Sequence, residues 1–419
     1  MSVQSYPTTD GQRYRVRWRD GVGRMRSRTF TSRAQARAFD IDIKARKLRG
    51  EPLPKPGRQT LAGAWAEYER QIAPRLAEAT RRSYRAQWNA HIRDRFDHHT
   101  LAALSAEPQL VDELVEDMEA RGVGRASQRK TLIVLSALLT QCVRWQKMAT
   151  NPVRGMVKPT AAPRRKARPF PPLLIERIRQ ELAARATKDQ TSVRGSGDAL
   201  LVSLLAYGGL RPQEALALRW ADIGKRTITV DKAASFGEEK ATKTESGRSV
   251  PLCAPLADDL AAWRRANGGP HDPALVFPGP SGALWSHSAF NNWRSRVWRP
   301  ALVRLAAADP NLGQLVTARP YDCRHSFVSL HLRASENPIE VAEWAGHAPD
   351  VMWRHYAHVV KELRGEPVVP VDRQILFARE VIGSRPDEEV RAFVVEGLKP
   401  PSEASEAFRR ALFAPRSAQ

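Results

Sequence analysis

The first part of the chain alternates apolar and charged residues. Tyr14, Val16 and Trp18 are separated by arginines, which is the two-residue period of a strand with one buried face. After a glycine-rich turn the alternation resumes, and from about Ser32 apolar residues recur at helical spacing instead. The pattern predicts a small β-sheet followed by one helix, in a domain of residues 1–57.

Residues 58–160 have a helical pattern throughout. Apolar residues recur every three or four positions along four segments, of which the first begins near Leu61 and the last ends before Pro152. Trp65 and Trp88 lie on the apolar faces of the first two segments. We therefore expect a helical bundle whose aromatic rings pack in its core and do not stack on nucleic-acid bases.

A mixed segment of helices and short strands follows, at residues 161–362. An apolar helix ends at Gly208-Gly209, and a second helix opens at Arg211. The segment RTITV and two further short runs alternate as strands do, and helices predominate after them. We expect an α+β domain in which helices surround a small three-stranded sheet.

Two proline-rich basic stretches separate these parts. GEPLPKPGR and KPTAAPRRKARPFPP do not continue a helix, because proline removes a backbone donor and fixes φ. The final part, residues 363–419, carries Ile375, Phe377 and Val381 at helical spacing, which indicates an element for protein–protein contact, with another subunit as the candidate partner. The patterns together predict a mainly α, multidomain protein with a small N-terminal sheet plus helix, a helical bundle and an α+β domain.

The chain is strongly basic. Its 67 Lys and Arg residues against 45 Asp and Glu give a formal net charge of +22, and residues 1–57 alone carry 14 basic and 5 acidic residues. A charge excess of this size is typical of nucleic-acid-binding proteins. A basic protein with no polyanionic partner is the alternative.

Cysteines and apolar runs argue against other classes of protein. Cys142, Cys253 and Cys323 are scattered, which matches neither a disulfide framework nor a zinc cluster. No apolar run approaches the ~18 residues that a bilayer-spanning helix needs, and the start of the chain lacks the apolar stretch of a signal peptide. We expect a cytoplasmic protein with no membrane contact.

Basic side chains gather in three places where they could contact phosphates. The predicted hairpin would carry a row of arginines on one face, and the helical part and the second proline-rich stretch supply further candidates. For each candidate alone, an ordinary solvent-exposed charge is the alternative. The candidate DNA contacts are Arg15, Arg17, Arg19, Arg26, Arg28, Arg81, Arg82, Arg85, Arg129, Lys130, Arg164, Arg165 and Lys166.

Three segments that together contain arginine, histidine and tyrosine follow one another along the chain. GGLRPQEALALRWADI contains Arg211, ARPYDCRHSFVSLHLRA contains Arg324, and VAEWAGHAPDVMWRHYAHV contains His347 and Tyr356. With the turn around Lys243, this order resembles the catalytic half of the tyrosine recombinases, the phage integrase family. RASQRKTLIVLSALLTQCVRWQKMATNPV is similar to the last helices of the core-binding (SAM-like) domain of that family. The Arg-rich N-terminal part is similar to the arm-type DNA-binding domain of phage integrases.

The resemblance implies a role for each of these residues. Arg211 and Arg324 would clamp the scissile phosphate, whose non-bridging oxygens gain negative charge during attack. Tyr356 would attack the phosphorus, and Lys243 would protonate the leaving 5′ oxygen as general acid. His347 would hydrogen-bond a non-bridging oxygen. The catalytic part shows no carboxylate cluster with two-metal spacing, so we expect no metal and no cofactor.

Tyr321 and Glu214 lie in the same motifs. The family usually shows His-x-x-Arg, and here Tyr321 occupies the first position, in YDCRH. Histidine there can accept the proton of the nucleophile, whereas a phenol with a pKa of about 10 is a poor base. Tyr321 could still hydrogen-bond the phosphate, and water or a neighbouring histidine would take the proton. Glu214 is expected to position the helix that follows Arg211.

The resemblance implies a site-specific DNA recombinase, the integrase of a phage or mobile element. It would act near the nucleoid of a bacterial host on double-stranded DNA attachment sites, as a homotetramer, through a 3′-phosphotyrosine intermediate and a Holliday junction. Accessory proteins that bend DNA or direct excision are further expected partners. The alternatives are a chromosome-resolving recombinase, which would lack the basic N-terminal part, a non-catalytic DNA-binding protein on a decayed recombinase fold, and a type IB topoisomerase.

Overall fold

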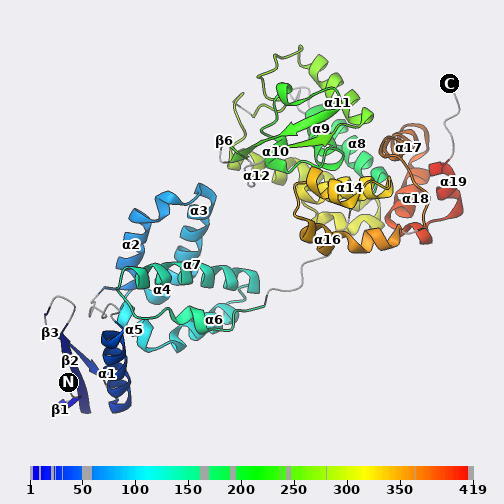
Figure 1. Ribbon diagram of the computed structural model, residues 1–419. Coiled ribbons are helices and arrows are strands. Elements are labelled where there is room, and N and C mark those ends of the chain that lie inside the picture. Colours follow the sequence, from blue (N-terminus) through cyan, green and yellow to red (C-terminus); the bar gives the residue numbers. More distant parts are fainter. Residues whose placement is uncertain are drawn as a thin grey trace. The chain divides into compact units, whose positions relative to one another are not determined.

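The computed structural model forms two compact units, Met1–Arg164 and Arg165–Gln419 (Figure 1). Unit 1 contains two separate hydrophobic cores, one in the N-terminal sheet and helix and one in the helical bundle, and unit 2 contains a single large core. The mainly helical fold class predicted from the sequence is confirmed. The structure describes residues 3–8, 11–19, 23, 25–30, 32–49, 59–160, 169–188, 195–235, 237–241, 247–279, 281–363 and 365–413.

The N-terminal part is a three-stranded antiparallel sheet with one helix. The strands β1 (Gln4–Thr8), β2 (Gly11–Arg19) and β3 (Met25–Phe30) lie side by side in chain order, and α1 (Arg33–Leu48) follows them. The α1 N-terminus is capped by Ser32, whose side chain accepts a hydrogen bond from a backbone N–H of the first turn. The predicted sheet and helix are therefore present, with one strand more than the predicted hairpin.

The pairing of β2 with β3 decides which side chains share a face. Residues that are paired in an antiparallel ladder point to the same side of the sheet. Arg26 is paired with Trp18 and Arg28 with Val16, and both of these apolar residues are buried. The Arg28 guanidinium lies 5.1 Å from the ring centroid of Phe39 in α1. Arg26 and Arg28 therefore lie on the helix-covered face.

The opposite face of the sheet carries the arginines of β2. Arg15, Arg17 and Arg19 alternate with the buried residues, and the Arg15 guanidinium lies 4.5 Å from the ring centroid of Tyr6 in β1. The prediction of one arginine row shared by two strands is therefore wrong for the β3 arginines. The reason is physical: turn length sets the register, and alternation within each strand does not reveal it.

The remainder of unit 1 is a helical bundle. The Trp65 ring stacks on Trp88, with ring centroids 4.6 Å apart, and on Tyr68 at 5.8 Å. These three residues are buried, which confirms that the aromatic residues form core. The helices of the bundle are α2 (Leu61–Gln71), α3 (Glu78–Gln87), α4 (Arg93–Phe96), α5 (Leu101–Ala106), α6 (Gln109–Ala120) and α7 (Arg125–Arg144).

Unit 2 packs its helices around one core, in which α8 and α9 make the most extensive contact. The α9 helix supplies the buried leucines Leu200, Leu201, Leu204 and Leu205. The helices up to residue 362 are α8 (Pro172–Lys188), α9 (Gly195–Ala206), α10 (Pro212–Ala215), α11 (Ala254–Ala266), α12 (His287–Trp293), α13 (Arg299–Ala308), α14 (Arg324–Arg333), α15 (Pro338–Trp344) and α16 (Pro349–Glu362).

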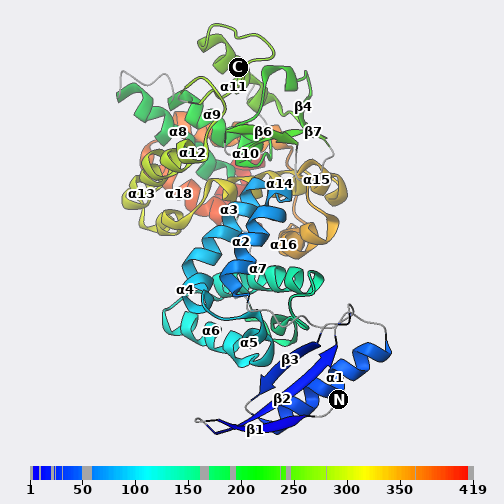
Figure 2. The ribbon, with the colours of Figure 1, turned by 90° about the vertical axis from the view of Figure 1, so that its left-hand side faces the viewer.

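The strands of unit 2 form two small sheets where one three-stranded sheet was expected. β4 (Thr227–Val230) pairs with β7 (Arg248–Pro251), and β5 (Lys232–Ser235) pairs with β6 (Glu238–Ala241), both antiparallel. Alternation identifies strands but not their partners, which accounts for the difference. Figure 2 shows α15 next to β7, and Arg248 Nε donates to the Trp344 carbonyl across this contact at 2.7 Å.

The last three helices, α17 (Val371–Ser384), α18 (Asp387–Leu398) and α19 (Glu406–Phe413), belong to unit 2 (Figure 1). Ile375, Phe377 and Val381 are at most 4% exposed and join its core. The α17 helix contacts α8, α11 and α14. The side chains expected to contact another subunit therefore pack inside their own chain.

Ion pairs fix α17 to the helices beneath it. Arg379 Nη2 lies 2.7 Å from a carboxylate oxygen of Asp259 in α11, and Arg379 Nε lies 3.3 Å from Glu176 in α8. The hydroxyl of buried Tyr207 donates to the same Glu176 carboxylate at 2.7 Å. This network connects three helices that are far apart in the sequence.

Candidate active site

The Gly-Gly turn before α10 brings two of the predicted segments together. Gly209 has a φ of +60°, and a Cβ there would lie 2.6 Å from the ring of Phe327 in α14. Only glycine therefore fits this position without displacing the ring. The Gly209 carbonyl accepts a hydrogen bond from Arg324 Nη1. The turn that precedes Arg211 thus also holds Arg324.

A buried carboxylate, Glu214, orients three arginines. It accepts hydrogen bonds from Arg211 Nη1 at 2.6 Å, from Arg248 Nη2 at 2.6 Å and from Arg248 Nη1 at 3.0 Å. The backbone N–H of Arg211 donates to it at 2.8 Å, and Arg324 Nη1 lies 3.8 Å away. Glu214 therefore does more than position the Arg211 helix, because it gathers guanidinium groups from three separate segments.

The charges of this cluster remain in place at neutral pH. Burial alone would raise the pKa of Glu214, but hydrogen bonds and charges from Arg248 and Arg211 lower it to about 2. Burial, and then the charge of Arg211, lower the pKa of Arg324 to about 10. One carboxylate therefore faces three guanidinium groups, and this excess of positive charge suits a phosphate.

Arg324 keeps donors available in the interior. Its side chain is fully buried, and among the residues that the structure describes neither Nε nor Nη2 has a hydrogen-bond partner. An unpaired buried donor costs about 1–3 kcal/mol, and a charged one costs more. This cost is recovered when an anion accepts both hydrogen bonds.

His347 lies beside the arginine cluster as a neutral group. The preceding Gly346 has a φ of +57°, and its carbonyl accepts from Arg211 Nη2 at 2.7 Å. Burial, followed by the charges of Arg324 and Arg211, lowers the pKa of His347 to about 3. A neutral imidazole carries one N–H, with which it can donate a hydrogen bond to a phosphate oxygen.

The predicted nucleophile lies next to His347. Tyr356 is 1% exposed, and its ring stacks on the His347 ring with centroids 6.3 Å apart. Its hydroxyl lies 2.5 Å from Nδ1 of His325. Burial raises the pKa of the Tyr356 phenol, and the charge of Arg324 offsets this only in part. The phenol is therefore protonated at neutral pH and needs a proton acceptor before it can attack.

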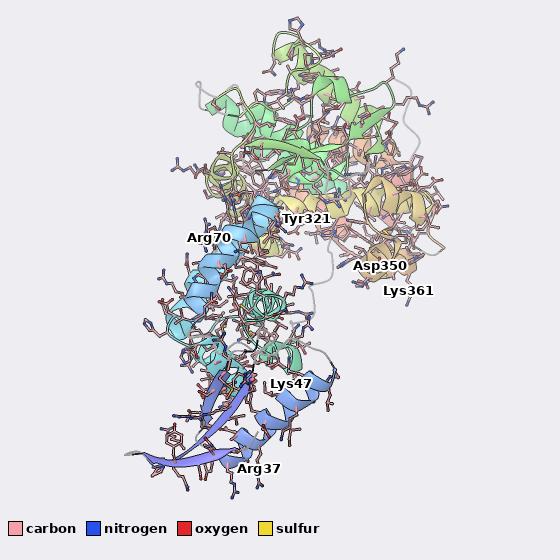
Figure 3. All side chains as sticks on the ribbon, turned by 60° about the vertical axis from the view of Figure 1, so that its left-hand side comes forward. Arg37, Lys47, Arg70, Tyr321, Asp350 and Lys361 are labelled. Carbon is pink, nitrogen blue, oxygen red and sulfur yellow. The ribbon has the colours of Figure 1, made fainter. Side chains whose placement is uncertain are left out.

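Tyr321, labelled in Figure 3, lies in the 3₁₀ turn Pro320–Cys323 directly before α14. Its ring meets the His325 ring edge-on, with centroids 5.8 Å apart. His325 therefore contacts both this tyrosine and Tyr356. Of the six predicted active-site residues, five belong to this one region of unit 2, and Lys243 lies outside the described residues.

Sequence reasoning missed two members of the site. Arg248 is the first residue of β7, and only the fold reveals that this strand begins beside Glu214. His325 belongs to the Arg-His dipeptide that opens α14, but nothing in that dipeptide indicates that Nδ1 reaches Tyr356. The available signal for Arg248 was its place as the one charged residue of the β7 strand, RSVP.

The predicted DNA contacts of unit 1 differ in their present partners. Arg81, Arg82 and Arg85 form ion pairs with acidic residues of their own bundle. Arg129 and Lys130 are exposed on α7. A phosphate would therefore compete with carboxylates at the first three and with water at the last two. Outside the described residues lie Arg164, Arg165 and Lys166.

Two kinds of feature are missing from the described part of the chain. Within it, no three or more His, Cys, Asp or Glu side chains are grouped so as to hold a metal ion. None of its helices combines the length and the apolar composition that crossing a bilayer requires.

Comparison with known sequences identifies tyrosine recombinases as relatives of this chain. Tyrosine recombinase XerC of Xanthomonas campestris pv. campestris (strain B100) is 26% identical over 240 residues, which cover 57% of this chain and 66% of that protein. XerC of Methylobacterium sp. (strain 4-46) is 28% identical over 287 residues, covering 67% and 82%. The chain thus spans somewhat less than two thirds of the Xanthomonas relative.

Solved structures share the fold. The Tn1549 transposon integrase in complex with circular intermediate DNA has a TM-score of 0.55 at 14% identity, over 74% of this chain and 100% of that one. A lambda integrase dimer bound to a COC′ core site has a TM-score of 0.52 at 16% identity, over 87% and 95%.

The phage integrase family model matches residues 176–362, which run from α8 to the end of α16. This segment contains the arginine cluster around Glu214 and the stacked pair of His347 and Tyr356. The sequence motifs, the fold and the family model agree that residues 176–362 form a domain of the phage integrase family.

Proposed function

We propose that this protein is a site-specific DNA recombinase that cleaves and rejoins DNA through a 3′-phosphotyrosine intermediate. The observation that carries the proposal is the position of Tyr356, buried in the same site as arginines from three segments and a neutral imidazole. A phosphate that accepted hydrogen bonds from the arginines would lie beside the tyrosine. This is the arrangement that a tyrosine hydroxyl needs to attack a phosphodiester.

The arginines would stabilise the transition state. In-line attack places additional negative charge on the non-bridging oxygens of the scissile phosphate. Arg324 has two donors without a partner among the described residues, and Arg211 is held in position by Glu214 and the Gly346 carbonyl. Arginine suits this role because it stays charged and offers donors in a fixed planar geometry. His347 would add one hydrogen bond.

Cleavage would join phosphorus to the Tyr356 oxygen and release a 5′ hydroxyl. Lys243 would protonate the leaving oxygen, a role that comes from the family resemblance. The bond energy stays in the phosphotyrosine, so a 5′ hydroxyl of another strand can reverse the step without ATP. Repeated in two pairs within a homotetramer, these steps would exchange strands through a Holliday junction.

The N-terminal sheet favours the integrase of a phage or mobile element. Its outer face presents Arg15, Arg17 and Arg19 for binding to phosphates of double-stranded attachment-site DNA. The match to the lambda integrase dimer extends over 87% of this chain, against 70% for a match limited to part of lambda integrase. Such an enzyme would work in the cytoplasm of a bacterial host, with accessory proteins that bend the DNA or direct excision.

A chromosome-resolving recombinase is the second candidate, because the XerC proteins are among the curated relatives. The two candidates differ in their need for residues 1–57. An enzyme that resolves chromosomes through a core site alone would work without this sheet, whereas an integrase that also binds arm sites would require it.

Covalent capture on DNA tests the proposed chemistry. The full chain is incubated with nicked suicide duplexes taken from the junctions of its element with host DNA, and covalent adducts are separated on a denaturing gel. We expect wild-type protein to form an adduct, and Tyr356→Phe to bind the same DNA without forming one, because it lacks only the attacking oxygen. An adduct formed by Tyr356→Phe would assign the nucleophile elsewhere.

A further inference from the structure

We propose that His325 is the general base of this enzyme and removes the phenol proton when Tyr356 attacks the phosphate. The inference rests on the proposed recombinase function and deepens it. It addresses the departure at Tyr321, which stands where the family pattern has a histidine able to take this proton. In this chain a different imidazole contacts the nucleophile.

The geometry distinguishes His325 from the other nearby imidazole. His325 Nδ1 lies 2.5 Å from the Tyr356 hydroxyl, within the reach required of a general base. His347 instead stacks its ring on the Tyr356 ring, at an interplanar angle of 24°. Among the described residues, His347 Nδ1 has no hydrogen-bond partner. His325 is therefore placed to accept the proton and His347 is not.

The surroundings of His325 keep its imidazole able to accept a proton. Burial is the largest influence and lowers the pKa of His325 to about 4, so the ring is neutral at pH 7. A neutral ring with its proton on Nε2 leaves Nδ1 as an acceptor. The titratable and charged groups facing it are Arg319, Tyr321 and Asp322 before α14, Arg324 in α14, and His347, His355 and Tyr356 on the neighbouring segments.

Two features favour formation of the imidazolium during the reaction. A bound phosphate brings negative charge to the site, which favours the charged form of the ring. His325 also lines a groove of about 820 Å³ together with Arg319 and Asp322, and this groove gives the proton a route to water.

In the proposed step, each bond that forms is matched by a bond that breaks. The Tyr356 O–H bond breaks and its proton passes to His325 Nδ1, while the phenol oxygen bonds to phosphorus. The bond from phosphorus to the 5′ oxygen breaks, and this oxygen receives a proton from the general acid, proposed to be Lys243. In the religation step the proton returns from the imidazolium to the tyrosine oxygen as it leaves.

Single-turnover cleavage of nicked duplexes by the full chain tests the role. His325→Gln retains a polar side chain of similar reach but takes up no proton at neutral pH. We expect its cleavage rate to fall by about 10²- to 10⁴-fold with DNA binding unchanged. The matched control is His358→Gln, another histidine of the same region, which should cleave at the wild-type rate.

A substrate with sulfur in place of the 5′ bridging oxygen separates the base from the acid. A thiolate leaves without being protonated, so loss of the general acid matters little on this substrate. We expect Lys243→Ala to recover most of its rate there, while His325→Gln stays slow. Recovery of His325→Gln would mean that it serves the leaving group, and the inference would be overturned.

The wild-type protein provides a measurement that does not depend on a folded variant. On the sulfur substrate, the cleavage rate should follow the neutral fraction of His325 and become level with rising pH once the ring is neutral in the DNA-bound protein. Direct loss of the proton to hydroxide would instead raise the rate about tenfold per pH unit, which would contradict the role of His325.

The outcomes separate this inference from the proposed function. Wild-type cleavage by His325→Gln, with Tyr356→Phe inactive, would remove the base and leave the recombinase standing. Failure of the wild-type protein to form any adduct on its own junction DNA would remove the proposed function itself. If His325→Gln does not bind DNA, the wild-type pH profile decides whether His325 or hydroxide takes the phenol proton.

Discussion

At the scale of single residues, Glu214 holds the arginine cluster together, although no step of the proposed reaction involves Glu214 directly. One carboxylate holds Arg211 and Arg248 by hydrogen bonds and lies 3.8 Å from Arg324. Three guanidinium groups would repel one another in the interior without it. Binding of an anionic substrate at this cluster would thus depend on an acidic residue.

Replacing Glu214 by Gln should destabilise the protein by about 3–5 kcal/mol, because it leaves buried arginines without a countercharge. Urea unfolding at neutral pH measures this loss. The control is Glu78→Gln, which removes the partner of exposed Arg81 and Arg82 and should cost at most about 1 kcal/mol. Equal losses for the two variants would show that Glu214 is not a structural centre.

The same residue predicts a pH dependence. The pKa of Glu214 is lowered in the folded protein from an ordinary value of 4.5 to about 2. A lowered carboxyl pKa stabilises the fold above the unfolded pKa and loses that contribution as pH falls. Unfolding free energy should therefore decline between about pH 4.5 and 2 in the wild type, and Glu214→Gln should lack this part of the decline.

At the scale of elements, sequence periodicity predicted the secondary structure and the buried faces, because these depend on residues that are close together in the chain. It identified β2 from the alternation of Val16 and Trp18 with arginines, and the bundle core from Trp65 and Trp88. It did not give strand partners or register, because these depend on turn length and on packing between distant segments. The same holds for the candidate site. The sequence motifs located Arg324 and Tyr356. The contact of His325 with Tyr356 was not predictable, because it depends on how α14 packs against α16.

The α17 helix provides a test at this scale. Phe377 is 4% exposed and contacts the rings of Phe393 and Phe408, so Phe377→Ala should cost about 3–5 kcal/mol of unfolding free energy. Val368→Ala, at a residue that is 55% exposed, should cost less than about 0.5 kcal/mol. If Phe377→Ala altered the assembly on DNA and left the stability of the free chain unchanged, α17 would contact another subunit and not its own core.

At the scale of the whole molecule, positive charge is distributed over distinct surfaces with distinct uses. In the N-terminal part, the outer sheet face carries Arg15, Arg17 and Arg19, while exposed Arg37 and Lys47 come from α1 (Figure 3). The outer sheet face would contribute affinity for DNA through released counterions, and that contribution depends on salt. The site in unit 2 would supply the chemistry, and the outer sheet face would supply DNA binding.

Deleting residues 1–57 should leave cleavage of short core-site duplexes intact and abolish recombination of long attachment-site DNA. A finer variant replaces Arg15, Arg17 and Arg19 by Gln. It should reduce the slope of log affinity against log salt by about 2.7, which is about 0.9 for each phosphate that is no longer neutralised. Replacing Arg37 and Lys47 by Gln is the control and should leave this slope unchanged. Full recombination by the deleted chain would favour the chromosome-resolving alternative.

The place of α17–α19 in the core of unit 2 also bears on protein synthesis. A nascent chain that has reached residue 362 already contains the three arginines, the histidines and the tyrosine of the site, yet it lacks the helices that cover α8 and α11. The ribosome must translate some fifty further codons before the core closes. A chain that stopped between residue 362 and α17 would therefore carry these reactive groups in a domain whose core is incomplete, and we expect such a chain not to cleave DNA.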